Sequence, residues 1–182
     1  GDAQAGGAVA LPVIGANRAV GGLTVNTASA TGTGGTVTVN GNITSQDAAV
    51  DLSNTAAVAM AAGTATATIT STNQNITIGS AITDGAVDQV LTFAAGTGSI
   101  TLAGANFDAG DATNSGGLAF TSGQNLTLSG NVTQRRTFDV TNLGGAVIIA
   151  DATVPSTRTI ETTGTASAIH FSGSETGTAG AN

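Results

Sequence analysis

One short pattern recurs through most of this chain: an apolar residue, a threonine and a second apolar residue, with another apolar residue six or seven positions later. Examples are "GTVTVNGNIT" (35–44), "QNITIGSAIT" (74–83), "GSITLAGANF" (98–107) and "QNLTLSG" (124–130). Alternation of apolar and polar residues has the period of a β-strand, because successive Cβ atoms point to opposite faces. The glycines and asparagines between the triplets are typical of corners that need positive φ. The pattern therefore predicts many short strands and no helix.

The triplets recur at a nearly fixed interval. Counted from the first apolar residue of each triplet, successive copies lie 18 to 26 residues apart, about 22 on average. The anchor residues are Val37, Val58, Ile76, Ile100, Leu126, Val147 and Ile169. A second apolar triplet precedes most anchors by eight or nine residues, and a third apolar position follows most of them. Each repeat thus predicts three short strands.

A fixed interval distinguishes between two all-β architectures. A sandwich pairs antiparallel strands through hairpins and does not require a constant repeat length. A β-solenoid stacks each strand on its equivalent in the next coil, so that neighbouring coils bury the apolar face that a single coil leaves exposed. We therefore predict a right-handed parallel β-helix of about seven coils of about 22 residues, with three strand faces; the handedness follows the crossover rule for parallel strands. Residues 22–182 form the repeats, and residues 1–21 form an N-terminal lead-in or cap.

Composition narrows the range of functions. Of the 182 residues, 8% are charged and 3% are aromatic, and the formal net charge is −7. Arginines are the only strong bases, so the chain lacks the basic patch that nucleic-acid phosphates require, and we expect no nucleic-acid partner. We also expect no membrane insertion, because no segment approaches the roughly 18 apolar residues of a spanning helix. The absence of cysteine excludes disulfides and thiolate metal sites.

Charged residues recur after the third apolar position of several repeats, which predicts that they share one corner of the solenoid. The acidic pairs are Asp47 and Asp51, Asp84 and Asp88, and Asp108 and Asp111, and the arginines are Arg135, Arg136 and Arg158. A bound Ca²⁺ would relieve the repulsion between stacked carboxylates, but solvent screening and the neighbouring arginines are a simpler relief. We therefore expect no metal site and no cofactor. The calcium candidates that stay open are Asp84, Asp88, Asp108 and Asp111.

Residue types that carry catalysis are scarce and scattered. His170 is the only histidine, and its place in the middle of the last anchor triplet predicts that it faces solvent. There is no lysine, and no tryptophan or tyrosine on which a sugar ring could stack. One set from which a polysaccharide-cleaving site could be assembled is Asp108, Asp111, Asp139 and Arg135. Their spacing does not require such a site, so we expect no catalytic residues and no enzymatic activity.

Four N-x-T sequences begin at corners of the repeat. Their asparagines are Asn42, Asn75, Asn125 and Asn131. In each case the asparagine ends a corner and the threonine lies in the strand that follows. We interpret these sequences as by-products of the repeat and not as glycosylation signals.

The units "GSITLAGANFDAG", "QNLTLSGNVTQ" and "GTVTVNGNITS" resemble the β-strand repeats of filamentous-haemagglutinin-like and autotransporter-type surface proteins of Gram-negative bacteria. The resemblance covers about residues 22–178. It implies a right-handed parallel β-helix, export to the cell surface and a role in attachment or scaffolding. We therefore expect an extracellular or bacterial cell-surface protein, a structural or adhesive segment of a stalk or fibre, with a host or matrix glycan or protein as a candidate partner.

Two alternatives stay open. A solenoid ends in unpaired backbone groups, which are a template for joining another chain. End-to-end self-association would make the chain a subunit of a filament or sheath. Other β-solenoids act on polysaccharides, so the second alternative is a polysaccharide-active or glycan-binding β-helix.

Overall fold

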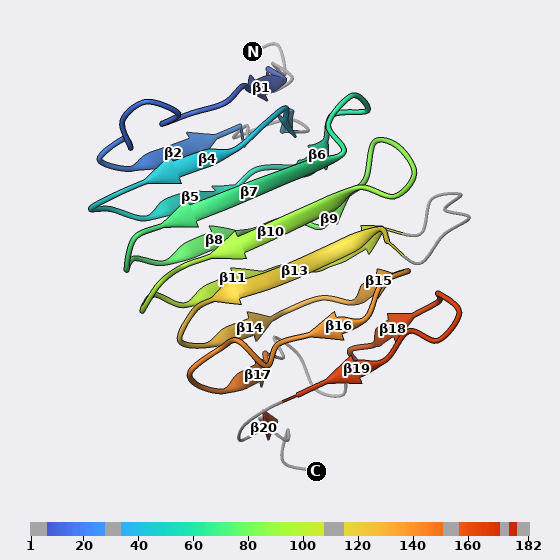
Figure 1. Cartoon of the computed structure of the whole chain (residues 1–182). Coiled ribbons are helices and arrows are strands. Elements are labelled where there is room, and N and C mark those ends of the chain that lie inside the picture. Colours follow the sequence, from blue (N-terminus) through green and yellow to red (C-terminus); the bar gives the residue numbers. More distant parts are fainter. Residues whose placement is uncertain (1–6, 28–33, 108–114, 151–156, 172–174, 178–182) are drawn as a thin grey trace, which may run out of the picture.

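The computed structural model confirms an all-β solenoid. It describes residues 7–27, 34–107, 115–150 and 157–171, and the backbone of 175–177. Every regular element in these ranges is a strand, and the strands pair in parallel. Within these ranges no helix is long and apolar enough to span a membrane. Seen from its N-terminal end, the chain winds clockwise as it recedes, so the solenoid is right-handed, as predicted (Figure 1).

Three parallel sheets form the walls of the solenoid, and each turn passes through them in the order A, B, C (Figure 1). Sheet A contains β1 (Val9–Leu11), β3 (Thr36–Val39), β6 (Ala57–Met60), β9 (Ile82–Thr83), β12 (Ala105–Phe107), β15 (Val132–Gln134) and β18 (Ile160–Thr162). Sheet C contains β2 (Leu23–Asn26), β5 (Val50–Asn54), β8 (Ile76–Ile78), β11 (Ile100–Leu102), β14 (Leu126–Leu128), β17 (Val147–Ile149) and β20 (Glu175–Gly177).

Sheet B covers only part of the stack. It contains β4 (Ile43–Ser45), β7 (Thr66–Ser71), β10 (Val90–Ala94) and β13 (Gly117–Ser122). Beyond β13, this wall is continued by β16 (Phe138–Asp139) and β19 (Ile169–His170), which pair with each other in a separate two-stranded sheet. The wall is therefore interrupted between β13 and β16.

The predicted number of coils is slightly too high, and the predicted repeat length is too short. About five turns, from β3 to β17, have a neighbouring turn on both sides. Paired strand residues in successive turns lie from 21 residues apart, as for Leu126 and Val147, to 31 apart, as for Phe138 and Ile169. The prediction of about 22 failed because the anchors belong to different walls: Val37 is in sheet A and Leu126 in sheet C.

Part of the predicted lead-in, residues 1–21, belongs to the first turn. β1 pairs with β3 in register. Two isolated bridges, Ile14 to Ile43 and Val20 to Ser45, continue this turn along β4. The first turn therefore uses single bridges where later turns have a strand of sheet B.

Columns of equivalent apolar side chains fill the interior. Ile76, Ile100 and Leu126 pair in register and are fully buried, as predicted. The threonine that follows each of them lies on the outer face of sheet C and is partly exposed. Full burial of one such apolar side chain is worth about 1.5–3 kcal/mol. Because each turn covers the column of its neighbour, the core is continuous along the stack.

The asparagines of the four N-x-T sequences tie successive turns together. Each Oδ1 accepts a hydrogen bond from a backbone N–H one turn later. The donors and acceptors are Thr68 to Asn42 at 2.9 Å, Ser99 to Asn75 at 2.9 Å, Ala146 to Asn125 at 2.9 Å and Thr159 to Asn131 at 3.0 Å. Three of these N–H groups lie directly before a strand, and that of Thr68 lies in β7 just before its pairing with β4, so none of them has an acceptor in the ladder. The asparagine amides provide it.

Replacement of Asn75 by alanine is expected to lower the free energy of unfolding by about 0.5–1.5 kcal/mol, the net value of one hydrogen bond. The bond that is lost is the one from the Ser99 N–H to Asn75 Oδ1. Urea unfolding followed by circular dichroism measures the change. Asn75→Asp keeps an acceptor oxygen and is the matched control, with a smaller loss expected. Equal losses in the two variants would contradict a bonding role for the side-chain oxygen.

Candidate functional site

The predicted single corner of charged residues is wrong. Asp47 lies between β4 and β5, and Asp51 lies within β5 in sheet C. Asp84 and Asp88 lie between β9 and β10, where the chain passes from sheet A to sheet B. The prediction failed because it treated the isoleucines before these residues as equivalent, although they belong to sheets B and A.

The other charged residues also separate. Asp108 and Asp111 lie outside the described residues. Arg135 and Arg136 follow β15, whereas Arg158 precedes β18 at the corner between sheets C and A. In the part of the chain that the structure describes, no three side chains of the His, Cys, Asp and Glu types are placed to hold a metal ion. Among the described residues, Asp84 and Asp88 therefore have no third His, Cys, Asp or Glu placed to complete a metal site with them.

The interruption of wall B breaks the regular repeat of the stack. β13 has six residues, but β16, the strand below it, has two. The turn containing β16 is also short, with 21 residues between Leu126 and Val147 compared with 26 between Ile100 and Leu126. A shorter turn supplies too little chain to extend a strand along the whole of β13. The wall therefore has a step below β13.

Two adjoining hollows lie at this step, and together we call them the step groove. One has a volume of about 160 Å³ and is lined from above by residues 118–121 of β13 and from below by Arg136, Thr137, Asp139 and Asn142. The other has a volume of about 380 Å³ and is lined by Val90, Ser115, Arg136 and Thr137. Arg136 and Thr137 line both hollows, so the two form one continuous surface feature.

Side chains replace the missing strand along the lower edge of β13. The Leu118 N–H donates to Gln134 Oε1 at 3.0 Å, and Asn142 Nδ2 donates to the Phe120 carbonyl at 3.1 Å. Gln134 is fully buried and also donates from Nε2 to the carbonyls of Arg136 and Thr137, both at 3.2 Å. The backbone N–H of Arg136 also donates to the Gly116 carbonyl at 3.0 Å. The corner that carries Arg136 is therefore held both by the Gln134 side chain and by the residue before β13.

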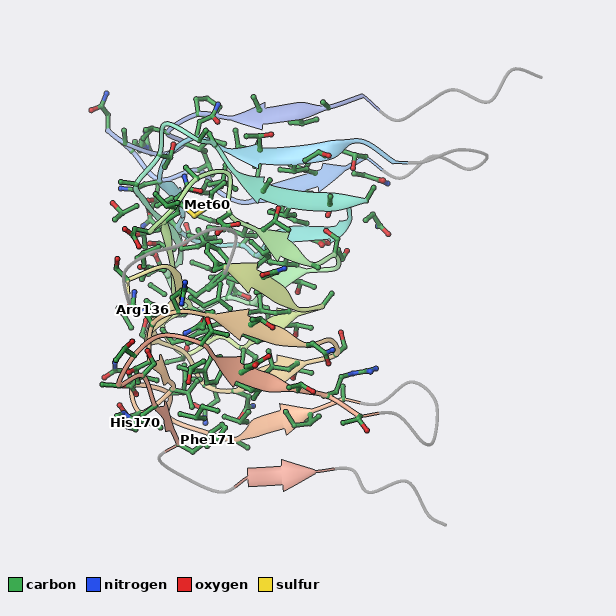
Figure 2. The ribbon with its side chains drawn as sticks, turned by 90° about the vertical axis from the view of Figure 1, so that its right-hand side faces the viewer. Met60, Arg136, His170 and Phe171 are labelled. Carbon is green, nitrogen blue, oxygen red and sulfur yellow. The ribbon has the colours of Figure 1, made fainter. Side chains whose placement is uncertain are left out.

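Arg136 is a partly buried cation at the centre of the groove. Desolvation lowers its pKa, and the negative charge of Asp139 raises it again in part. A guanidinium is not deprotonated in proteins, so the side chain keeps its charge. Figure 2 shows Arg136 and His170 on the same side of the stack.

Asp139 is the anionic member of the groove. Its Oδ1 accepts a hydrogen bond from the Thr141 N–H at 2.9 Å, and its Oδ2 lies 3.8 Å from His170 Nδ1 in the next turn. The backbone bond from Thr141 is the main reason why the pKa of Asp139 lies below its ordinary value of 3.8; the Thr141 hydroxyl and His170 also lower it. His170 is exposed, as predicted. Asp139 is therefore ionised at neutral pH.

The depressed pKa of Asp139 predicts a pH-dependent contribution to stability. The fold favours the ionised carboxylate, so the contribution is fully present above the ordinary pKa of 3.8 and is lost as the pH falls through the lower value of the folded protein. We expect Asp139→Asn to lower Tm by at most a few degrees at neutral pH, because solvent screens a side chain that is nearly half exposed. Thermal melts at neutral pH and near pH 2 should show this difference shrinking in acid. A difference that does not vary with pH would contradict the assignment.

Sequence reasoning found only part of this site. It considered Asp139, but together with Arg135, whose Nη1 instead donates to the Thr163 carbonyl at 3.4 Å. It missed Arg136 as a groove residue, and it missed Asn142. The available signal was the segment "RRTFDVTN" (135–142), which concentrates polar residues in a short turn.

Comparison with known proteins provides no relative for this chain. No protein-family model, no curated protein and no solved structure matches it.

Proposed function

We propose that this chain is a non-enzymatic structural or adhesive segment of an extracellular bacterial stalk or fibre. The observation that carries the proposal is the continuity of the stack, in which columns of buried side chains and inter-turn hydrogen bonds run through successive turns. Continuous backbone ladders make a stiff element, because one turn cannot bend away from its neighbours without breaking several bonds at once. Stiffness along one axis is the property that a stalk requires.

The outer faces also fit this proposal. Sheet B presents Thr66, Thr68 and Thr70 of β7 on its outer face, and Thr92 of β10 lies beside Thr68. These short hydroxylated side chains are compatible with strands and leave the surface without strong charge. The resemblance of the repeats to filamentous-haemagglutinin-like and autotransporter-type proteins supports the same location and role.

Immunolabelling of intact and permeabilised cells of the source organism tests the location. We expect labelling of intact cells, and loss of attachment to host or matrix glycans or proteins when the gene is deleted. Labelling that requires permeabilisation would overturn the extracellular assignment. A deletion strain that attaches normally would restrict the role to scaffolding.

A filament or sheath subunit is the second candidate, and the ends of the stack favour it. Sheets A and C begin with β1 and β2 and end with β18 and β20, so in the described residues these strands each have one neighbour in their sheet. Near the C-terminal end, Ile169 and Phe171 are 40% and 37% exposed. Strand edges and apolar side chains of this kind are covered when a second copy stacks on the end. Electron microscopy of the purified chain distinguishes the candidates: long filaments support end-to-end assembly, and short rods of uniform length contradict it.

A further inference from the structure

The step groove brings together two opposite charges that do not neutralise each other by direct contact. Arg136 and Asp139 both line the smaller hollow and attract each other. Among the described residues, however, no ion pair joins them; Asp139 instead contacts Thr141 and His170. A partly desolvated charge is stabilised when a group of opposite sign approaches it. The groove therefore offers a cationic and an anionic position side by side.

The edge of β13 adds a neutral donor and a neutral acceptor. In a strand, the N–H and C=O of one residue point to the same side, and alternate residues point to the same neighbour. The Leu118 N–H bonds to Gln134, and the Phe120 carbonyl bonds to Asn142, both below β13. The Leu118 carbonyl and the Phe120 N–H therefore also point below β13, and both residues line the smaller hollow. An edge of this kind pairs readily with groups of a ligand.

These four groups have one chemical complement. A guanidinium and a backbone N–H bind a carboxylate, with the guanidinium able to form two parallel bonds. A carboxylate and a backbone carbonyl accept hydrogen bonds from an ammonium group. A ligand that carries a carboxylate and an ammonium on one carbon presents both groups to these partners at once. That ligand class is the zwitterionic α-amino acid.

Size and charge agree with this class. The smaller hollow, at about 160 Å³, has room for a small molecule. The adjoining hollow of about 380 Å³, beside Val90 and Ser115, offers space for a side chain. A zwitterion has no net charge, so the formal charge of −7 on the protein does not repel it. We propose that the step groove binds a free α-amino acid, with Arg136 and the Phe120 N–H on the carboxylate and Asp139 and the Leu118 carbonyl on the ammonium group.

Ligands with one charge removed test the proposal on the unmodified protein. Isothermal titration calorimetry compares L-alanine with N-acetyl-L-alanine, which lacks the ammonium, and with L-alanine methyl ester, which lacks the carboxylate. We expect saturable binding of L-alanine and at least tenfold weaker binding of each blocked form. Equal binding of N-acetyl-L-alanine would overturn the zwitterion assignment, because the site would then recognise carboxylates alone. Absence of saturable binding for a panel of small and larger amino acids would overturn the site itself.

Variants test the residues. Arg136→Gln and Asp139→Asn are each expected to weaken L-alanine binding at least tenfold. Arg18→Gln removes an exposed arginine in the first turn, far from the groove in the stack, and is the matched control with unchanged binding. Circular dichroism confirms that each variant is folded before titration. Binding that is unchanged in a folded Asp139→Asn protein would contradict the role given to the carboxylate, and equal weakening in Arg18→Gln would show a general charge effect and overturn the site.

Discussion

Replacement of Gln134 by leucine is expected to lower the free energy of unfolding by about 3 kcal/mol or more. The side chain is fully buried and satisfies three backbone groups: the Leu118 N–H and the carbonyls of Arg136 and Thr137. Leucine has a similar size but no polar atoms, so these groups lose their partner. Each buried polar group that is left without a hydrogen bond costs about 1–3 kcal/mol. Urea unfolding, with the change read from the midpoint at constant slope, measures the loss.

The matched control is Gln46→Leu. Gln46 is exposed in the turn after β4, and the same substitution there is expected to change the free energy of unfolding by no more than about 0.5 kcal/mol. Because Gln134 also fixes the corner that carries Arg136, its replacement should weaken the step groove as well as the fold. Similar small effects in both variants would show that the buried amide of Gln134 is not needed.

Replacement of Gly130 by alanine is expected to destabilise the protein by about 1–3 kcal/mol or more, in the range of overpacked interior sites. Gly130 lies between β14 and β15, against the turn before it. A Cβ atom at this position would lie 1.6 Å from the Ala103 carbonyl oxygen, which is backbone and cannot rotate away. The two turns would have to separate at this corner, with loss of the strand pairing beside it. Thermal unfolding measures the effect, and about 1 kcal/mol corresponds to about 2–4 °C for a chain of this size.

Gly63→Ala serves as the control for this prediction. Gly63 lies between β6 and β7, and an added Cβ would meet no atom within 4 Å. We expect its Tm to stay close to that of the unmodified protein. A Gly130→Ala protein that melts together with the Gly63→Ala protein would show that the spacing of the turns at this corner is not tight.

The interior of the solenoid could be predicted from the sequence because its chemistry repeats. Ile76, Ile100 and Leu126 occupy equivalent positions in a fixed pattern, and the structure stacks them in one buried row. A parallel stack requires each turn to present the same apolar positions to the next, so the same apolar pattern recurs in the sequence of every turn. The all-β class, the parallel pairing and the number of walls follow from this requirement.

The assignment of residues to particular walls could not be predicted in the same way. All three walls use the same apolar–polar alternation, as Val37 in sheet A and Ile100 in sheet C show. Nothing local distinguishes one wall from another, so anchors from all three walls were combined into one series. The short repeat length and the false charged corner are both consequences of this single ambiguity.

The step groove was not predictable because it depends on a difference between turns. Arg136 and Asp139 meet the edge of β13 only because β16 is too short to cover that edge. A repeat analysis averages over turns and therefore removes the irregularity that creates the site. Loops of variable length carry function for the same reason in other folds.

The asparagine hydrogen bonds give the stack a direction. In each pair the accepting oxygen lies in the earlier turn and the donating N–H in the later one, as with Asn42 and Thr68 or Asn131 and Thr159. A turn that has folded thus displays acceptors that select the position of the turn emerging after it. Polypeptide delivered from its N-terminus, during synthesis or through a translocation pore, would then meet a finished template at every step.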